Sequence, residues 1–266
     1  MNNKATAMAS KSVSKPKLIY VEGNIGSGKS TLMDLCRSRE NLEVIGEPVE
    51  KWQKFYTHNF LKYKYQDKRP EIQLMFQLMV NLTRLDQLNE AKPTEKTIMM
   101  ERSILSGFQI FTKIALIREE ISGLEMCMLH FMNKIFTEKM LGDFCKPDLI
   151  IYLRTDPEVC LQRLKHRGRW EEKGIEIEYL NQLHQAHEEW LGVQHNNRPG
   201  YNTPCPVVTL DGNRTDDEYP QLLAQLDEEL EKLNGTENKE NTKRWDLDAA
   251  IKKWKERRAR GADEVD

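Results

Sequence analysis

The sequence predicts a three-layer α/β/α fold built on a five-stranded parallel sheet, and three observations support that prediction. Short aliphatic runs recur along the chain, as expected for strands that are buried on both faces of a parallel sheet. Patterns of helical period separate these runs, which implies right-handed crossover connections. A glycine-rich segment, Gly23–Ser30, follows the first run and opens the first helical pattern.

The predicted strands are short and rich in aliphatic and β-branched residues. They are Leu18–Val21, Glu43–Ile45, Thr97–Met100, Leu149–Leu153 and Val207–Leu210. Helical patterns occur at Ser30–Arg37, Glu71–Leu88, Ser103–Glu119, Gly123–Met140, Pro157–Lys165 and Glu178–Gln194. One stripe of the second pattern is predicted to face the core, and it comprises Ile72, Met75, Phe76, Met79, Leu82 and Leu85.

The chain of 266 residues fits one large domain with tails. We predict a disordered leader at 1–16, a single domain at 17–233 and a charged tail at 234–266, in which a short amphipathic helix is an open alternative. The net charge of −2 argues against a nucleic-acid polymer as partner, because such binding needs a broad basic face. The apolar runs are too short to cross a membrane, so no membrane partner is expected.

Five cysteines without a CxxC pair predict reduced thiols and a cytoplasmic location. The leader leaves mitochondrial targeting as an alternative, although it contains no arginine. His184 and His187 are spaced like a metal-binding pair on a helix, but no third ligand is evident in the sequence. We interpret them as structural helix contacts.

The segment from Gly23 to Ser30 matches the phosphate-binding pattern GxxxxGK[ST] without a mismatch. The glycines let successive backbone N–H groups point at phosphate, and the dipole of the following helix favours an anion. Lys29 is expected to reach the β- and γ-phosphates, and Ser30 to bind Mg²⁺. The predicted cofactors are thus ATP and Mg²⁺, and the predicted ATP-binding residues are Gly23, Asn24, Ile25, Gly26, Ser27, Gly28, Lys29, Ser30 and Thr31.

This loop alone leaves GTPases, ABC ATPases, motor proteins and small-molecule kinases open. A GTPase is disfavoured because neither Asn133-Lys134 nor Asn238-Lys239 continues into the guanine-reading NKxD motif. Glu47 favours a kinase, because it follows the second strand at the sheet edge where ligands bind. A carboxylate there can accept the proton of a substrate hydroxyl that attacks the γ-phosphate. The alternative is that Glu47 only caps a turn.

Two further clusters point to the same chemistry. Glu101 and Arg102 follow the third strand, where Glu101 could orient the Mg²⁺ shell and Arg102 could neutralise charge beside the base, although such a pair is common at strand ends. The segment Arg163–Arg169 carries four formal positive charges in seven residues. Its arginines can grip phosphate oxygens through two hydrogen bonds each, and Gly168 suits a hinged lid. A solvated basic helix end is the alternative.

Taken together, these motifs resemble the deoxyribonucleoside kinase family, which contains the deoxycytidine, deoxyguanosine and mitochondrial thymidine kinases and the insect multisubstrate enzyme. The resemblance extends over Lys17–Leu210. Its matching stretches are Val21–Thr31, Glu47–Trp52, Glu101–Ser103, Asp148–Arg154, Arg167–Glu172, Tyr179–His184 and His187–Leu191.

The resemblance implies a P-loop kinase fold and roles for individual residues. Glu47 is similar to the family's general base on the deoxyribose 5′-hydroxyl, and Arg102 and Arg169 resemble its partners. Glu101 is similar to the residue near Mg²⁺. Arg163 and Arg167 resemble lid arginines that contact the phosphates, beside Lys29 in the phosphate loop.

On the nucleoside side, Glu172 resembles the residue that holds the 3′-hydroxyl together with a tyrosine, either Tyr65 or Tyr63. Gln77 is similar to the residue that reads the base edge. Trp52 and Phe111 resemble the aromatic walls of the base pocket, with Phe111 stacking on the base.

The chain departs from the family's pattern in the base pocket. Arg84 lies seven residues after Gln77, as in the deoxycytidine and deoxyguanosine kinases, whereas thymidine-accepting enzymes have a smaller apolar residue there. The arginine-bearing enzymes also carry an aspartate where this sequence has Gly107, and Phe108 replaces the family's usual arginine. We therefore predict a pyrimidine-leaning enzyme that uses deoxycytidine, with use of thymidine depending on Arg84.

The function that follows is ATP-dependent phosphorylation of the 5′-hydroxyl of a deoxyribonucleoside, a step of nucleotide salvage. The resemblance also implies a homodimer. Two alternatives stay open from the sequence. One is a nucleoside monophosphate kinase similar to thymidylate kinase, and the other is a P-loop protein that binds nucleotide for regulation without catalysis.

Overall fold

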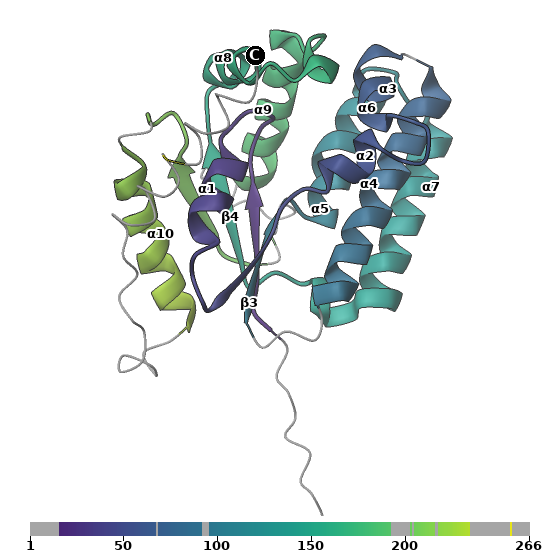
Figure 1. Ribbon diagram of the computed structural model, residues 1–266. Coiled ribbons are helices and arrows are strands. Elements are labelled where there is room, and N and C mark those ends of the chain that lie inside the picture. The colour runs from purple at the N-terminus through teal and green to yellow at the C-terminus, as the bar shows by residue number, and fades with distance from the viewer. Residues whose placement is uncertain are drawn as a thin grey trace, which may run out of the picture.

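A computed structural model of the chain describes residues 16–67, 69–91, 96–192, 203, 205–215, 218–234 and 256. Its sheet has five parallel strands in the order β2-β3-β1-β4-β5 (Figure 1). The strands are β1 (Leu18–Glu22), β2 (Leu42–Ile45), β3 (Thr97–Glu101), β4 (Leu149–Arg154) and β5 (Val207–Asp211). The predicted fold class is confirmed, and each strand extends one residue beyond its predicted bounds at one end.

Two predicted segments lie almost entirely outside the described residues. They are the leader at 1–16, of which only Pro16 is described, and the tail at 234–266, of which only Asn234 and Glu256 are described. Among the described helices, none is long and apolar enough to cross a membrane.

Helices surround the sheet on both faces. The α-helices are α1 (Lys29–Cys36), α2 (Val49–Gln53), α3 (Phe60–Gln66), α4 (Pro70–Ala91), α5 (Ile104–Ser106), α6 (Lys113–Ile117), α7 (Gly123–Lys134), α8 (Pro157–Arg167), α9 (Ile177–Leu191) and α10 (Tyr219–Asn234). Two π-helical segments, η1 (Gly107–Thr112) and η2 (Ile135–Leu141), continue α5 and α7, and two short 3₁₀ segments are η3 (Gly142–Cys145) and η4 (Trp170–Glu172).

The core consists of two apolar layers separated by the sheet. Successive residues of the central strand β1 point to opposite faces, as strand geometry requires. Leu18 and Tyr20 pack into a cluster with residues of α4, α5 and α9, whereas Ile19 and Val21 pack into a cluster with α1 and α10. Figure 1 shows the same three layers, with α1 and α10 on the side of the sheet opposite α4.

The structure corrects the predicted helix Ser103–Glu119. It begins as α5, widens into the π-helical segment η1 and returns to α-helical geometry in α6. The Thr112 hydroxyl donates a hydrogen bond of 2.9 Å to the Gly107 carbonyl, five residues earlier, across the wide turn. A π segment changes the direction of the side chains that follow it and is frequent at functional sites, but an apolar pattern of period 3.6 does not reveal it.

The prediction that the apolar stripe of α4 is entirely buried is wrong at two positions. Phe76, Met79 and Leu85 are buried, but Met75 and Leu82 are 45% and 49% exposed. The sequence also did not predict α2, α3 or α10. The first two are only five and seven residues long, which is too short for a clear helical period.

His187 is a buried structural contact, as interpreted from the sequence. Its ring stacks on Tyr152 at a centroid distance of 5.9 Å, and its Nδ1 lies 2.6 Å from the Leu183 carbonyl oxygen. Burial, reinforced by the positive charge of Arg102, lowers the pKa of His187 from 6.5 to about 3. The folded protein therefore holds this imidazole neutral at pH values where the unfolded chain would protonate it.

Because the unfolded state binds the extra proton between these two pKa values, stability should fall as the pH is lowered from about 6.5 towards about 3. The contribution of one such group is at most about 1.4 kcal/mol per pH unit. We expect His187→Gln to flatten the dependence of the urea midpoint on pH in this range. His184→Gln, on the same helix, is the control and should leave the slope unchanged. Equal slopes for wild type and His187→Gln would contradict the assignment.

Candidate active site

The glycine-rich loop between β1 and α1 curls tightly before the helix begins. Gly26 has φ of 77°, and a Cβ atom there would lie 2.7 Å from the Cys160 carbonyl oxygen, so a larger residue does not fit. Gly28 has φ of 99° and directly precedes α1, which starts at Lys29. The loop therefore delivers backbone N–H groups to the start of a helix, which is a favourable site for an anion.

Lys29 lies within this loop. Its side chain is buried, and its Nζ donates to the carbonyl oxygens of Asn24 and Gly23 at 2.7 and 3.3 Å. Burial, and after it the positive charge of Arg102, lower the pKa of Lys29 to about 8, although the carboxylates of Glu101 and Glu47 act to raise it. The ammonium group thus depends on acidic neighbours, and a phosphate would stabilise it in the same way.

Ser30 and Glu101 bring oxygen atoms together beside Lys29. The Ser30 hydroxyl donates to the Glu101 carboxylate at 3.1 Å, which joins the first turn of α1 to the end of β3. Burial raises the pKa of Glu101, and the negative charge of Glu47 raises it further. A cation would relieve both effects. A hydroxyl and a carboxylate oxygen suit Mg²⁺, which usually binds one or two carboxylates and keeps water and phosphate ligands.

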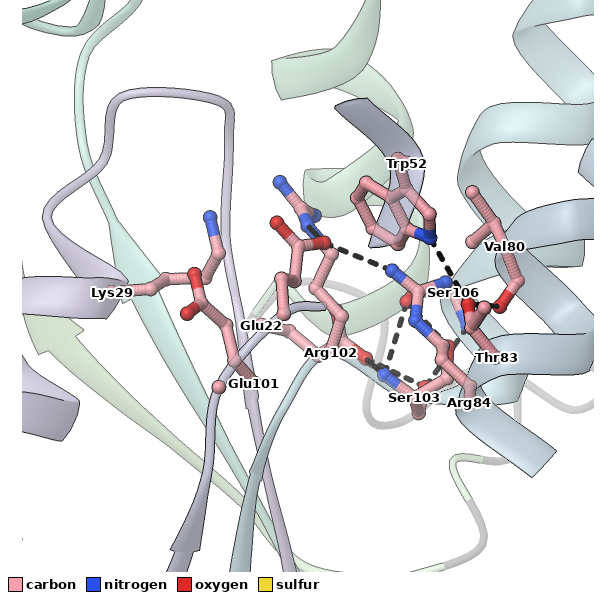
Figure 2. Close-up of polar contacts among 12 residues, drawn as sticks. Glu22, Lys29, Trp52, Val80, Thr83, Arg84, Glu101, Arg102, Ser103 and Ser106 are labelled. Atoms are coloured by element: carbon pink, nitrogen blue, oxygen red, sulfur yellow. Dashed lines mark hydrogen bonds and ion pairs between the residues drawn. The ribbon is translucent and has the colours of Figure 1, made fainter. Parts of the chain in front are cut away.

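Glu47 lies between two arginines that come from different elements. Arg102 at the end of β3 and Arg84 on α4 both contact its Oε1, with N–O distances of 2.9 Å from Nε and 3.0 Å from Nη2. Figure 2 shows Arg102 between Lys29 and Glu101 on one side and Arg84 on the other. Burial raises the pKa of the Glu47 carboxyl, but Arg102, Arg84 and Lys29 together outweigh burial and hold this pKa below its usual range.

The arginine-rich segment at the end of α8 makes two kinds of contact. Arg167 and Arg169 each pair with one carboxylate oxygen of Glu172, at 2.5 and 2.8 Å, on either side of Gly168, which has φ of 68°. Arg163 instead donates to three carbonyl oxygens. They belong to Ser27 at 3.0 Å, Gly212 at 2.8 Å and Arg214 at 2.9 Å. Arg163 therefore braces the phosphate loop, and its predicted contact with phosphate stays a prediction.

A single cavity of about 1210 Å³ connects these groups. That volume exceeds the roughly 300–1,000 Å³ of a site for one small ligand, so two ligands can share it. Most of the predicted site residues line the cavity: Ile25, Gly26, Gly28, Lys29, Ser30, Thr31, Glu47, Trp52, Tyr65, Gln77, Arg84, Glu101, Arg102, Phe111, Arg163, Arg167, Arg169 and Glu172. Gly23, Asn24, Ser27 and Gly107 are not among the residues that line it.

Comparison with known proteins now identifies the family. A family model described as deoxynucleoside kinase matches residues 19–231. The chain is 36% identical to thymidine kinase 2, mitochondrial, of Macaca fascicularis over 211 residues, covering 79% of this chain and 76% of the relative. It is 33% identical to human deoxycytidine kinase over 253 residues, covering 85% and 95%, and 35% identical to a probable deoxycytidine kinase of fowlpox virus over 209 residues, covering 77% and 83%.

The chain belongs to the deoxynucleoside kinase family. It is thus a kinase, an enzyme of a family that acts in nucleotide salvage and uses ATP as phosphate donor. The resemblance inferred from the sequence is confirmed. Which residues carry the reaction is a separate question, which depends on the geometry of the cavity.

Part of this kinase's cavity has aromatic and hydroxyl-bearing walls. Trp52 packs edge to face on Phe76, and its indole N–H donates to the Thr83 hydroxyl at 3.0 Å. Tyr65 lines the cavity, and the charges of Glu172 and Glu47 raise its pKa further after burial has raised it. Tyr63 instead lies beside His58, outside the cavity lining. Of the two tyrosines left open by the sequence, Tyr65 is therefore the one near Glu172.

Three polar side chains lie on one stripe of α4, and two of them, Gln77 and Arg84, line the cavity. Gln77, Asn81 and Arg84 are buried, and Gln77 Oε1, Asn81 Oδ1 and Arg84 Nε and Nη1 have no hydrogen-bond partner among the described residues. A Cβ atom at Gly107 would lie 2.8 Å from Asn81 Oδ1 and 3.6 Å from Arg84 Nη1. An amide oxygen thus occupies the space that a side chain at position 107 would enter, and within the described residues Arg84 forms its ion pair with Glu47.

The sequence did not single out three residues that shape the site. Asn81 and Thr83 belong to α4, where the apolar positions were used only to predict the side of the helix that faces the core. Tyr219 on α10 lines the cavity, and its hydroxyl would lie 3.0 Å from a Cβ atom at Gly28. Asn81 could have been found, because it lies one helical turn after Gln77 on the same face. Tyr219 is far from every motif, so no local signal marks it.

Proposed function

We propose that this kinase transfers the γ-phosphoryl group of ATP to the 5′-hydroxyl of a deoxyribonucleoside, with Glu47 as the general base. One observation carries the proposal: a carboxylate held by two guanidinium groups lines the same cavity as the lysine of a phosphate-binding loop. A triphosphate bound by the loop and an alcohol near Glu47 would then share one cavity and could be aligned for phosphoryl transfer.

Glu47 is suited to accept the proton of the attacking hydroxyl. Its ion pairs with Arg84 and Arg102 both end on Oε1, so Oε2 is the oxygen that we assign to the substrate. The arginines keep the carboxylate ionised despite its burial, because they hold its pKa below the usual range. The base is therefore ready at neutral pH without prior loss of a proton.

The positive groups around the cavity would stabilise the charge that develops on the transferred group. Lys29 is placed in the loop to contact the phosphates, and Arg102 lies beside Glu47. Arg167 and Arg169 extend from the lid segment, each with further N–H donors beyond the contact with Glu172. Such fixed donors in an enclosed site are usually the largest contribution to catalysis of this kind.

Ser30 and Glu101 would hold Mg²⁺, because a hydroxyl and a carboxylate of raised pKa are adjacent beside the phosphate loop. When bound, the ion would neutralise phosphate charge and orient the triphosphate. Glu172 and Tyr65 are assigned to the 3′-hydroxyl, Gln77 to the base edge, and Trp52 and Phe111 to the two faces of the base.

Two alternatives fit the site less well. A nucleoside monophosphate kinase would place an acceptor phosphate where Glu47 lies, and the two negative groups would repel each other in a buried site. A regulator that only binds nucleotide needs no carboxylate and arginine pair across from the loop. Incubation with dTMP and with thymidine distinguishes a nucleoside monophosphate kinase, which would phosphorylate dTMP, from the proposed kinase, which would phosphorylate thymidine. Turnover of ATP distinguishes the proposed kinase from a regulator that only binds nucleotide.

Glu47→Gln should lower kcat by about 10²–10⁴, the usual contribution of a general base, while nucleoside binding survives. A radiolabelled-ATP assay over the deoxynucleosides measures kcat, and an equilibrium binding experiment measures the affinity for the nucleoside. Glu43→Gln, on the same strand β2, is the matched control and should retain full activity. Near-normal turnover of Glu47→Gln would remove Glu47 from the role.

Base preference is the second expected outcome. We predict that deoxycytidine leads among the four natural deoxynucleosides in kcat/KM, and that Arg84→Met raises the ratio of thymidine to deoxycytidine, because a smaller apolar side chain makes room beside Gln77 for the thymine methyl group. A lead of purines by more than about tenfold, or about 1.4 kcal/mol, would contradict the pyrimidine preference.

We also propose that the kinase is a homodimer formed through α4 and α7. These helices pack beside each other at the outer layer of the molecule (Figure 1). Both expose large apolar side chains, namely Met75 and Leu82 on α4 and Leu124, Met128 and Phe131 on α7. Clustered exposed apolar side chains of this size usually mark an interface. Contact with a second copy would also explain why the α4 stripe continues onto solvent-exposed positions.

Substitution of Leu124 and Phe131 by glutamate should convert the dimer to a monomer, since each charge would be buried in the interface. Sedimentation or light scattering after gel filtration measures the mass. Ile117→Glu is the control, because Ile117 is 58% exposed on α6, outside this surface. A wild-type mass of one chain, or an unchanged dimer in the double variant, would contradict the proposal.

Cytoplasmic residence is the location that the cysteine content favours, and one of the relatives is named as mitochondrial. Fractionation of cells that express the full chain separates the two locations.

A further inference from the structure

Glu22, the last residue of β1, is a buried carboxylate with no role in the reaction described above. Its side chain is fully buried, and its Oε1 accepts two hydrogen bonds from Ser103, at 2.9 Å from the backbone N–H and 2.6 Å from the hydroxyl. Its Oε2 has no partner among the described residues. Burial raises the pKa of Glu22, and the charge of Arg102 and the bonds from Ser103 oppose that rise.

The residue before Ser103 has an unusual backbone conformation. Arg102 has φ of 61°, in the left-handed region that residues with a Cβ atom rarely adopt. Such strain persists only where surrounding contacts determine it, and it is concentrated at active sites. Two contacts with β1 hold this turn. The Arg102 N–H donates to the Val21 carbonyl oxygen at 2.9 Å, and Ser103 is fixed by the side chain of Glu22.

The turn decides where the Arg102 side chain points. Its Nε lies 2.9 Å from Glu47 Oε1, and its guanidinium lies 4.8 Å from the centre of the Phe111 ring. Ser103 also caps α5 through a hydrogen bond of 3.0 Å from the Ser106 N–H, so the same serine sets the start of the helix that leads to Phe111. Loss of the Glu22 contact would therefore move two walls of the site at once.

Glu22 also connects this turn to the phosphate loop. It is the residue directly before Gly23, whose carbonyl oxygen accepts a hydrogen bond from Lys29. One side chain thus fixes the position of Arg102 relative to the loop that would hold the triphosphate. Such a link matters for phosphoryl transfer, because the reacting groups must be aligned within a fraction of an ångström.

We propose that Glu22 is a positioning residue for phosphoryl transfer, which holds Arg102 against Glu47 by fixing Ser103 to the end of β1. The inference rests on the proposed function of Glu47. It assigns Glu22 no contact with substrate; the role of Glu22 is to accept the hydrogen bonds from the Ser103 N–H and hydroxyl inside the protein.

Glu22→Ala removes the acceptor and should lower kcat about tenfold or more, because small misplacements of catalytic groups have effects of up to about 10²-fold. The KM values for nucleoside and ATP should change less than threefold, roughly, because the proposed binding contacts remain. Glu22→Gln keeps an oxygen that accepts from Ser103 and should recover a large part of the loss. This conservative variant keeps the proposal testable if Glu22→Ala does not fold.

Tyr20→Phe is the matched control. Tyr20 lies two residues earlier on the same face of β1, is equally buried, and donates to the Cys145 carbonyl oxygen at 3.2 Å, far from Ser103 in the sequence. Glu22→Ala loses two buried hydrogen bonds and Tyr20→Phe loses one, so both should lower the melting temperature. Only Glu22→Ala should lower kcat.

A double-mutant cycle tests the route through Arg102. If Glu22 acts by holding Arg102, then Glu22→Ala should have almost no further effect on kcat in an Arg102→Met background. An undiminished effect in that background, or a kcat for folded Glu22→Ala within twofold of wild type, would overturn the proposal. Failure of the underlying mechanism is recognised separately, because Glu47→Gln would then retain normal turnover.

Discussion

The structure depends on a balance of buried charges at one edge of the sheet. The carboxylates of Glu22, Glu47 and Glu101 and the cations of Lys29, Arg84 and Arg102 are all removed from water to a large degree. Each would be costly to bury alone, and removal of one partner from such a set leaves an uncompensated charge. The groups are therefore stable only together, which fixes β1, β2, β3, α1 and α4 relative to one another around the cavity.

Parallel topology explains how these charges meet. In a sheet of order β2-β3-β1-β4-β5, the carboxyl ends of the three strands β2, β3 and β1 are neighbours. Glu47, Glu101 and Glu22 lie at or just after those ends, although they are far apart in the sequence. Arg102 is held at this edge by a hydrogen bond to β1 and reaches Glu47 beyond β2. A site assembled from adjacent strand ends is the general rule for open α/β sheets.

Sequence reasoning was most successful where the signal is local. The phosphate loop is contiguous, and the strands are short aliphatic runs, so both follow from the residues themselves. The position of Glu47 after β2 followed from topology, but its pairing with Arg84 depends on how α4 packs. The π-helical segment at Phe111 has no signature in an apolar pattern of period 3.6. The exposure of Met75 and Leu82 was missed because periodicity identifies an apolar stripe but does not show which of its residues other helices cover.

Each arginine around the cavity can contact a protein carboxylate with one edge and a ligand with another. This property explains why lysine would not replace them. Each has one edge engaged by a fixed acceptor: Glu47 for Arg84 and Arg102, and Glu172 for Arg167 and Arg169. A guanidinium has five N–H donors in a rigid plane, so an edge remains for a ligand after the first contact is made. Arg102 Nη1 and Arg84 Nε and Nη1 are buried without a partner among the described residues, as expected for such edges. A lysine would donate from one rotating ammonium group and could not hold its acceptor and its ligand in two fixed directions.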